Sequence, residues 1–150
     1  KIGKGFLLLD LGAKYKGYCA DMSRMLYLGK PSDKELNWYN RLLKIQEKAI
    51  KEVSEGKNFS EVDNFVRKEL GMDSSYFIHS LGHGLGLEIH EAPRVGPDSK
   101  DKVCKNCVFT IEPGVYFPGK FGLRIEDTVL FDGKVKILTK SSKELQIIEF

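Results

Sequence analysis

Residues 6–21 read FLLLDLGAKYKGYCAD, and this stretch decides the class of fold. The apolar run at residues 6–10 is typical of a short buried strand, and residues 18–21 are typical of a second strand. Glycines at positions 12 and 17 favour a turn between the two strands. The sequence therefore predicts a β-hairpin in which an aspartate, Asp10 or Asp21, ends each predicted strand.

The register of this hairpin decides how the two aspartates lie. If the turn is centred between Tyr15 and Lys16, Asp10 lies directly across from Asp21. Side chains in that relation have Cβ atoms about 5 Å apart on one face of the sheet. Two carboxylates at this separation suit a pair of metal ions about 3.5–4 Å apart. A bulge in either strand would change the register.

Beyond the hairpin, residues 24–27 continue the second strand, and two helices follow. Ser32 is predicted to cap the first helix, because Glu35 completes a capping box, and Gly56 is predicted to end it. The predicted buried stripe of this helix comprises Leu36, Tyr39, Leu42, Leu43, Ala49, Ile50 and Val53. Ser60 is predicted to cap the second helix and Gly71 to end it. Its apolar face comprises Val62, Phe65, Val66 and Leu70.

The rest of the chain favours strands, at residues 78–81, 108–111, 114–117, 122–130, 135–138 and 145–150. No linker, repeat or low-complexity segment divides the sequence, so residues 1–150 are predicted to form one unit. We expect an α+β fold in which two helices pack on one face of a curved, mostly antiparallel sheet.

Composition excludes several classes of protein. The chain is 41% hydrophobic and 30% charged with a net charge of +3, and its lysines are scattered, so we expect no nucleic-acid partner. No apolar run approaches the roughly 18 residues of a membrane span, so we expect no membrane association. Three cysteines disfavour a disulfide framework and predict a reducing, cytoplasmic location. Because the sequence begins with Lys1 rather than methionine, we expect further residues upstream.

Residues 79–91 read HSLGHGLGLEIHE and hold all three histidines of the chain. A zincin site needs His-Glu-x-x-His on a helix, but here that glutamate is missing and three glycines disfavour a helix. Glycines at this density let the backbone approach a ligand closely. We interpret the segment as an extended stretch that lines a site, with His79, His83 and His90 as candidate functional residues.

Two glutamates lie at strand positions where an unpaired charge is costly. Glu112 ends one β run just before a turn, and Glu126 lies within another. Period-two alternation places Glu126 on the same strand face as Arg124 and Thr128, with Asp127 on the other face. A buried salt bridge between Glu126 and Arg124 is the structural alternative to a functional role.

Five residues together form a candidate two-metal site: Asp10, Asp21, His83, Glu112 and Glu126. Four carboxylates and one imidazole that converge without a metal would repel one another and resist ionisation. Around two divalent ions the same set forms a stable cage. Ligands rich in oxygen with one imidazole favour a hard or borderline ion such as Mn²⁺ or Co²⁺.

These motifs resemble those of the pita-bread metallopeptidases, the creatinase/aminopeptidase-like fold of methionine aminopeptidase, aminopeptidase P and prolidase. The resemblance covers essentially the whole chain, from the Leu-Leu-Asp10-Leu-Gly strand to the Arg-Ile-Glu126-Asp strand, and the order of the ligands matches. The run Leu-Glu88-Ile-His90-Glu91 and the Ala-Pro-Arg94 that follows look like prolidase. The resemblance therefore implies an exopeptidase that hydrolyses the Xaa-Pro bond of a proline-containing dipeptide.

The resemblance also implies a role for each ligand. Asp10 would bind the first metal ion, His83 and Glu112 would bind the second, and Asp21 and Glu126 would bridge both. The two ions would generate a bridging hydroxide that attacks the scissile carbonyl. Glu112 is the implied residue that takes and passes on the proton of that water.

Four further residues are implied to act beyond the metal ions. His79 and His90 would contact the substrate and stabilise the tetrahedral intermediate. Arg94 and Arg124 are candidates to pair with a substrate carboxylate or to hold the carboxylate ligands in place.

In this family the catalytic domain has two related halves, often preceded by a domain that drives dimerisation. The resemblance implies that residues 1–150 are a partial catalytic domain that lacks the start of its first half. We therefore expect the full-length protein to be a homodimer. In the isolated chain we expect a complete set of metal ligands and an incomplete substrate pocket.

Two alternative functions stay open. An aminopeptidase P-like enzyme would remove the residue before proline from longer peptides, and the accepted peptide length distinguishes it from a dipeptidase. A metal-free relative that binds peptides or proteins is the other alternative, and the complete ligand set argues against it. Creatinase-like chemistry is a weaker rival, because those relatives work without the metal carboxylates.

The pair Cys104-Lys-Asn-Cys107 has the spacing of a redox dithiol or half of a zinc site. Since no second pair completes such a site, we predict a structural role. Asn106 suits a backbone position with positive φ, and Cys107 suits a small buried position before the next strand.

Overall fold

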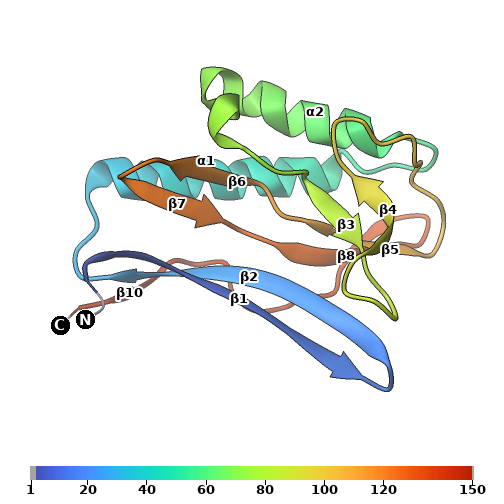
Figure 1. The fold of residues 1–150 in the computed structure, drawn as a ribbon, viewed down its shortest axis with the longest axis horizontal. Helices are drawn as coiled ribbons and strands as arrows, with labels where there is room; N and C mark the ends of the chain where they lie inside the picture. Colours follow the sequence, from blue (N-terminus) through green and yellow to red (C-terminus); the bar gives the residue numbers. More distant parts are fainter. Residues whose placement is uncertain (1–2, 150) are drawn as a thin grey trace.

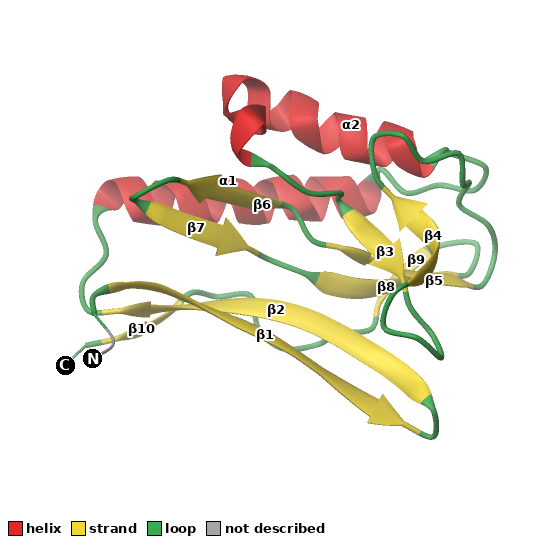
Figure 2. Ribbon diagram, in the orientation of Figure 1, coloured by secondary structure: helices red, strands yellow, loops and turns green. Residues whose placement is uncertain are grey.

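The computed structural model describes residues 3–149. Its helices are α1 (Asp33–Lys51), α2 (Phe59–Leu70) and a short 3₁₀ helix, η1 (Gly71–Tyr76). Its strands are β1 (Gly5–Tyr15), β2 (Tyr18–Leu28), β3 (Gly82–Gly84), β4 (Glu91–Val95), β5 (Cys107–Ile111), β6 (Gly114–Phe117), β7 (Phe121–Arg124), β8 (Asp127–Phe131), β9 (Val135–Ile137) and β10 (Gln146–Ile148). Figure 2 shows both long helices on one side of the strands, so the predicted α+β class is confirmed.

Within residues 3–149 the strands form three small sheets. β1, β2 and β10 form the first sheet, β4-β3-β5-β8-β9 the second, and β6 with β7 the third. Every pair of strands is antiparallel except β10 with β2, which is parallel. In Figure 1 the β1–β2 hairpin lies along one side of the molecule and the helices along the other, with β7 and β8 between them.

The β1–β2 hairpin forms around a different turn from the predicted one. Tyr15 pairs with Tyr18, so the turn residues are Lys16 and Gly17. Both turn residues have positive φ angles, 49° and 87°, as in a type I′ turn. Because the backbone of such a turn matches the twist of the flanking strands, this chemistry decides the register.

The predicted pairing of the two aspartates is therefore wrong. Asp10 pairs with Ser23, and Asp21 pairs with Gly12. The two carboxylates are diagonal neighbours, two residues apart along the ladder, rather than direct partners. They still share one face of the hairpin, since side chains two positions apart on a strand point the same way.

Helix α1 begins as predicted and ends earlier. Glu35 N–H donates to Ser32 Oγ at 3.4 Å, and the Ser32 N–H donates to the Glu35 carboxylate at 2.8 Å, so the capping box is confirmed. The helix stops at Lys51, whereas Gly56, with φ of 77°, belongs to the turn that follows. Of the predicted stripe, Leu36 and Leu43 are half-buried and five residues are buried: Tyr39, Leu42, Ala49, Ile50 and Val53.

Helix α2 begins two residues before the predicted start. Its N-cap is Asn58 rather than Ser60, and the Asn58 N–H donates to Glu61 Oε1 at 3.0 Å. The earlier start makes Phe59 the first helical residue, where it is fully buried. Gly71, with φ of 62°, ends the helix as predicted.

The predicted strand at residues 78–81 is absent from the structure, and the strand begins only at Gly82. Side chains of α2 bind the backbone groups that a neighbouring strand would need. Arg67 donates to the carbonyls of Phe77 and His79 at 3.0 and 2.8 Å. The buried Asp63 carboxylate accepts the N–H of Leu81 at 3.0 Å.

The predicted strand at residues 122–130 is interrupted. It forms β7 and β8, separated by residues 125 and 126. At the interruption the Glu126 N–H donates to the carbonyl of Ser23 in β2, at 3.3 Å. The chain thus leaves one sheet and joins another at the position of a predicted metal ligand.

The remaining strands agree with the prediction to within one residue at most ends: 107–111, 114–117 and 135–137. The predicted strand at residues 145–150 appears as β10 at 146–148, and residue 150 lies outside the described residues. Within residues 3–149, no helix is long and apolar enough to cross a membrane. The positive φ predicted for Asn106 is confirmed at 66°.

Candidate metal centre

Three of the predicted ligands meet where β2, β3 and the β7–β8 interruption approach one another. Asp21, His83 and Glu126 each offer one ligand atom, and these atoms lie within 4.8 Å of one another. His83 Nε2 is 3.5 Å from Asp21 Oδ2 and 3.4 Å from Glu112 Oε1. Three of the five predicted ligands therefore converge, and Glu112 lies beside them against His83.

Asp10, the fifth predicted ligand, lies beside this cluster. Its carboxylate pairs with the Arg124 guanidinium, and its side chain is 54% exposed. It is near enough for its charge to raise the pKa values of Asp21 and Glu112. The structure thus places Asp10 at the edge of the site, where it faces an arginine.

Burial opposes the ionisation of the carboxylates in this cluster. Burial raises the pKa of Glu112 to about 7. Burial, together with the charge of Glu112, raises the pKa of Glu126 to about 8. Burial also raises the pKa of Asp21, although His83 opposes this shift.

These shifts test whether the residues fit a pair of divalent ions. Burial is their main cause and neighbouring carboxylates add to it, so the metal-free centre opposes the ionised forms that a divalent ion would favour. A set of carboxylate oxygens around one imidazole nitrogen is the donor chemistry of a hard or borderline divalent ion. The residues present therefore fit the predicted metal centre.

Two hydroxyl side chains orient the glutamates, and the sequence did not single them out. Ser23 Oγ donates to Glu126 Oε2 at 2.7 Å. Thr110 Oγ1 donates to Glu112 Oε1 at 2.9 Å and accepts the N–H of His83 at 3.0 Å. Ser23 follows Asp21 by two residues, and Thr110 precedes Glu112 by two, so strand alternation was the available signal.

Arg124 does not form the buried salt bridge with Glu126 that the sequence left open. Its guanidinium pairs with Asp10, lies 4.0 Å from Glu112 Oε2, and donates to Ser23 Oγ at 3.1 Å. Within the described residues the carboxylate of Glu126 is instead bonded to the Ser23 hydroxyl. Arg124 thus lies at the edge of the carboxylate cluster, between Asp10 and Glu112, and both of its predicted roles stay predictions.

His79 lies on the far side of Arg124, joined to it through a tyrosine that the sequence did not single out. His79 Nε2 is 3.1 Å from Tyr116 Oη, which also accepts from Arg124 Nη1 at 3.4 Å. Burial lowers the pKa of His79, so the neutral imidazole is favoured. Tyr116 lies two residues after Gly114 on β6, and no motif marked it.

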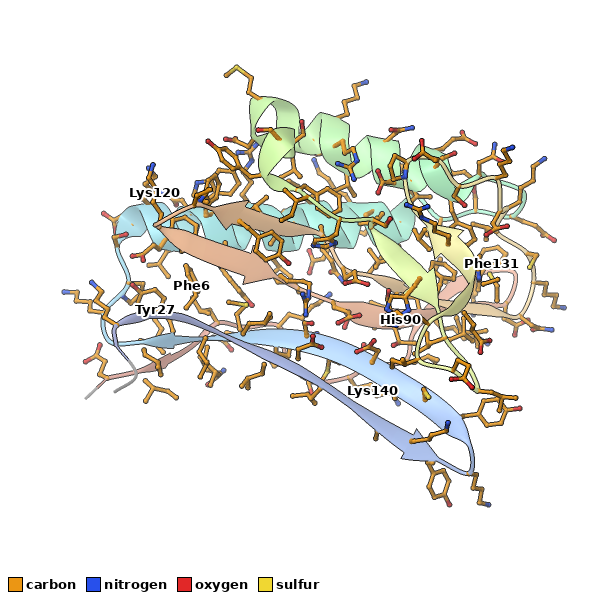
Figure 3. The ribbon with its side chains drawn as sticks, viewed as in Figure 1. Phe6, Tyr27, His90, Lys120, Phe131 and Lys140 are labelled. Carbon is orange, nitrogen blue, oxygen red and sulfur yellow. The ribbon has the colours of Figure 1, made fainter. Side chains whose placement is uncertain are left out.

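His90 and Arg94 are both neighbours of the ligand His83, and Arg94 is its partner in the β3–β4 ladder. The His90 ring packs edge-on against His83 with ring centroids 4.1 Å apart, close to the end of β3 (Figure 3). Arg94 is exposed, and its guanidinium donates to Ser80 Oγ at 3.3 Å. An open cavity of about 470 Å³ is lined by residues that include Arg67, His79, Ser80 and Arg94.

Three known proteins are similar to this chain in sequence or in structure. The chain is 43% identical over 150 residues to the Xaa-Pro dipeptidase of Pyrococcus furiosus, a match that covers 97% of this chain and 43% of that protein. The crystal structure of a prolidase from Thermococcus sibiricus superposes with a TM-score of 0.94 at 42% identity, over 99% of this chain and 41% of that one. An X-Pro aminopeptidase from Thermotoga maritima gives a TM-score of 0.90 at 36% identity, over 95% and 42%.

These similarities confirm the predicted pita-bread fold. The chain spans less than half the length of the relatives it matches. Residues 2–132 match the sequence model of metallopeptidase family M24. On the strength of this match and of the 43% identity, the chain belongs to metallopeptidase family M24.

Proposed function

We propose that the full-length protein is a two-metal-dependent exopeptidase that hydrolyses the Xaa-Pro bond of dipeptides. The observation that carries this proposal is the convergence of Asp21, His83 and Glu126 at one point, with Glu112 beside them. The similarity to a protein named Xaa-Pro dipeptidase supports the choice of substrate. Proline's imide nitrogen has no hydrogen, so peptidases that need that donor fail on this bond, and a dedicated site is required.

We propose that Asp10, Asp21, His83, Glu112 and Glu126 hold the two ions. Divalent ions bound there supply a Lewis acid for the scissile carbonyl and make water a nucleophile at neutral pH. Glu112 is the candidate to accept and pass on the proton of that water. Thr110 fixes the orientation of that carboxylate.

We propose that His79, His90 and Arg94 bind the substrate. His90 lies against the ligand His83, and His79 is tied to the carboxylate cluster through Tyr116 and Arg124. Arg94 lines a cavity next to His79 and can pair with the carboxylate of a substrate. A dipeptide places its carboxylate one residue beyond the scissile bond, so a cation that pairs with this carboxylate would favour short substrates.

Aminopeptidase P-like removal of the first residue from longer peptides is the second candidate, supported by the likeness to an X-Pro aminopeptidase. The metal, the oligomeric state and the cellular location are proposed on separate grounds. We propose Mn²⁺ or Co²⁺ as the metal from the ligand chemistry, a homodimer from the family resemblance, and the cytoplasm from the three free cysteines.

The deciding experiment compares Asp21→Asn with Asp132→Asn in the complete protein that carries these residues. Asp132 is a surface carboxylate that pairs with Lys136, so it controls for the loss of a charge. Mn²⁺-loaded samples are assayed on Ala-Pro and on Ala-Pro-Ala. We expect cleavage of Ala-Pro to fall at least about 100-fold in Asp21→Asn, as for loss of a metal ligand, and to be unchanged in Asp132→Asn.

Each other outcome has a clear meaning. Preference for Ala-Pro-Ala would establish the aminopeptidase P-like function instead. Equal activity of Asp21→Asn and the unaltered protein would rule out the two-metal mechanism. Metal binding without cleavage of either peptide would leave the peptide-binding alternative.

A further inference from the structure

We infer that the buried ion pair between Arg24 and Asp127 is a positioning device for the metal centre. Neither residue belongs to the predicted ligand set. Arg24 directly follows Ser23 in the sequence, and Asp127 directly follows the ligand Glu126. The inference deepens the proposed function, because it concerns the same metal site. It assigns to the pair the task of holding Asp21 and Glu126 at the separation that two ions require.

The two ligands come from elements of different sheets, which side chains as well as backbone connect: Thr128 Oγ1 donates to the Asp21 carbonyl and Ser23 Oγ to the Glu126 carboxylate, both at 2.7 Å. Asp21 lies on β2 and Glu126 directly precedes β8, and these strands belong to different sheets. The backbone contact at this junction is a single isolated bridge between Ser23 and Glu126. Its hydrogen bond, from Glu126 N–H to the Ser23 carbonyl, is 3.3 Å long. An isolated bridge lacks the neighbouring rungs that fix the spacing of strands within a sheet.

Arg24 binds both sides of this junction. Its Nη1 donates to the carbonyl of Ser23 at 2.9 Å and to the carbonyl of Glu126 at 2.5 Å. Its Nη2 donates to Asp127 Oδ1 at 2.7 Å. A planar guanidinium with five donors can make these contacts at once, whereas an ammonium group cannot match the same geometry. The residue is only 8% exposed, so water does not compete strongly for these groups.

Asp127 anchors the guanidinium from behind. Its carboxylate is fully buried and also accepts from Thr139, Gln46 and Lys143, at 2.7, 2.9 and 2.9 Å. With the bond from Arg24, four side chains donate to this carboxylate and fix its position. Arg24 is held between it and the junction.

The negative charge of the centre gives this clamp a function. Asp21 and Glu126 bring ligand atoms to within 4.8 Å of each other, so their carboxylates face each other across this junction and like charges there would repel. Arg24 donates to the backbone carbonyl of Glu126 rather than to its carboxylate, so the carboxylate stays available for metal. Removing this grip is expected to weaken metal binding before it abolishes folding.

The test measures Mn²⁺ binding by calorimetric titration of the complete, metal-stripped protein. Arg24→Met removes the clamp, and Arg24→Lys keeps the charge without the planar fork. Arg24 binds one carboxylate and three carbonyls, those of Ser23, Glu126 and Ser141. Arg41→Met is the control, because Arg41 likewise binds one carboxylate, that of Asp73, together with the carbonyls of Glu69 and Leu70. The Arg41 contacts join α1 to the end of α2, away from the metal centre.

We expect Arg24→Met to lower Mn²⁺ affinity by about 10–100-fold, the usual cost of losing a residue that orients metal ligands. Arg24→Lys should fall between this variant and the unaltered protein. Arg41→Met should lower Tm and leave Mn²⁺ affinity within about twofold. Excess Mn²⁺ should restore cleavage by Arg24→Met with an unchanged KM for the dipeptide.

The inference is overturned if Arg24→Met, folded by circular dichroism, binds Mn²⁺ as tightly as the unaltered protein. If Arg24→Met does not fold, the decision passes to Arg24→Lys, whose unchanged affinity would overturn the inference in the same way. Unaltered protein that binds Mn²⁺ but cleaves no proline peptide refutes the proposed function alone. Unaltered protein that binds no Mn²⁺ refutes both.

Discussion

At the scale of single residues, the centre is a group of carboxylates whose ionisation is opposed by burial. The pKa values of Glu112 and Glu126, about 7 and about 8, lie above the ordinary value in an unfolded chain. The folded, metal-free protein therefore binds these protons more tightly than the unfolded chain does. The contribution of these two groups to the free energy of unfolding of the metal-free protein is therefore greatest below about pH 4.5. It declines as the pH rises toward 8.

We predict that Glu126→Gln removes much of this pH dependence. In the metal-free protein the free energy of unfolding should fall between pH 5 and pH 8, by on the order of 1 kcal/mol per pH unit. The amide cannot ionise, so the variant should be the more stable protein at pH 8 and should bind metal poorly. Urea unfolding across this pH range, with a chelator present, measures both quantities. A parallel decline in the two proteins would contradict the assignment of the shift to Glu126.

A second residue-scale prediction concerns the hydroxyl of Thr110. Thr110→Val keeps the shape of the side chain and leaves the His83 N–H without its acceptor. Loss of this buried hydrogen bond and of the bond to Glu112 should cost about 1–3 kcal/mol of unfolding free energy. Thr110→Ser retains the hydroxyl and is the matched control. A loss in Thr110→Ser with none in Thr110→Val would mean that the methyl group, not the hydroxyl, matters.

The sequence could predict the ligand types at this scale but not all of their partners. Asp21, His83, Glu112 and Glu126 each lie in a motif, and the structure brings them together. Ser23, Thr110 and Tyr116 are common residues whose role depends on which strand faces them. That information is tertiary, and a single sequence does not contain it.

At the scale of elements, the hairpin turn sets the register of two predicted ligands. Gly17→Val should destabilise the protein by about 1–2 kcal/mol, because Gly17 has φ of 87° and a β-branched residue is strained there. Lys16→Asn should instead stabilise the protein by a few tenths of a kcal/mol, since asparagine tolerates positive φ. Denaturant titration of both variants checks the prediction. A destabilised Lys16→Asn would show that the lysine side chain contributes more than the backbone.

The elements show where local sequence is sufficient. The first helix could be predicted from its capping box, and the register of the hairpin could not be predicted without the type of turn. The predicted strand at residues 78–81 failed for a different reason. Arg67 and Asp63, on α2, bind its backbone, and this competition between a side chain and a strand ladder is not visible in apolar pattern.

At the scale of the whole molecule, the proposed metal centre joins elements of different sheets. Asp21 belongs to the β1–β2–β10 sheet and His83 to the sheet that contains β3 and β8. Ions bound between them should therefore stabilise the molecule as a unit. At a free Mn²⁺ concentration 1,000 times Kd, each independent site adds about 4 kcal/mol to the free energy of unfolding.

We predict a large fall in Tm when the complete protein is stripped of metal, with one cooperative transition before and after. Scanning calorimetry in Mn²⁺ and in chelator measures it. Asp21→Asn should show little response to Mn²⁺, whereas Asp132→Asn should respond like the unaltered protein. A metal-dependent Tm that survives in Asp21→Asn would place the stabilising ion elsewhere.

The isolated bridge between Ser23 and Glu126 also has a consequence for the order of folding. The two residues are 103 positions apart in the chain, whereas the β1–β2 hairpin and the two helices are built from local contacts. Closing so long a loop is entropically costly, so the bridge should form after the local elements. Interactions that form late act on unfolding rather than on folding rates. Metal bound at this junction would then lengthen the lifetime of the native state without hastening its formation.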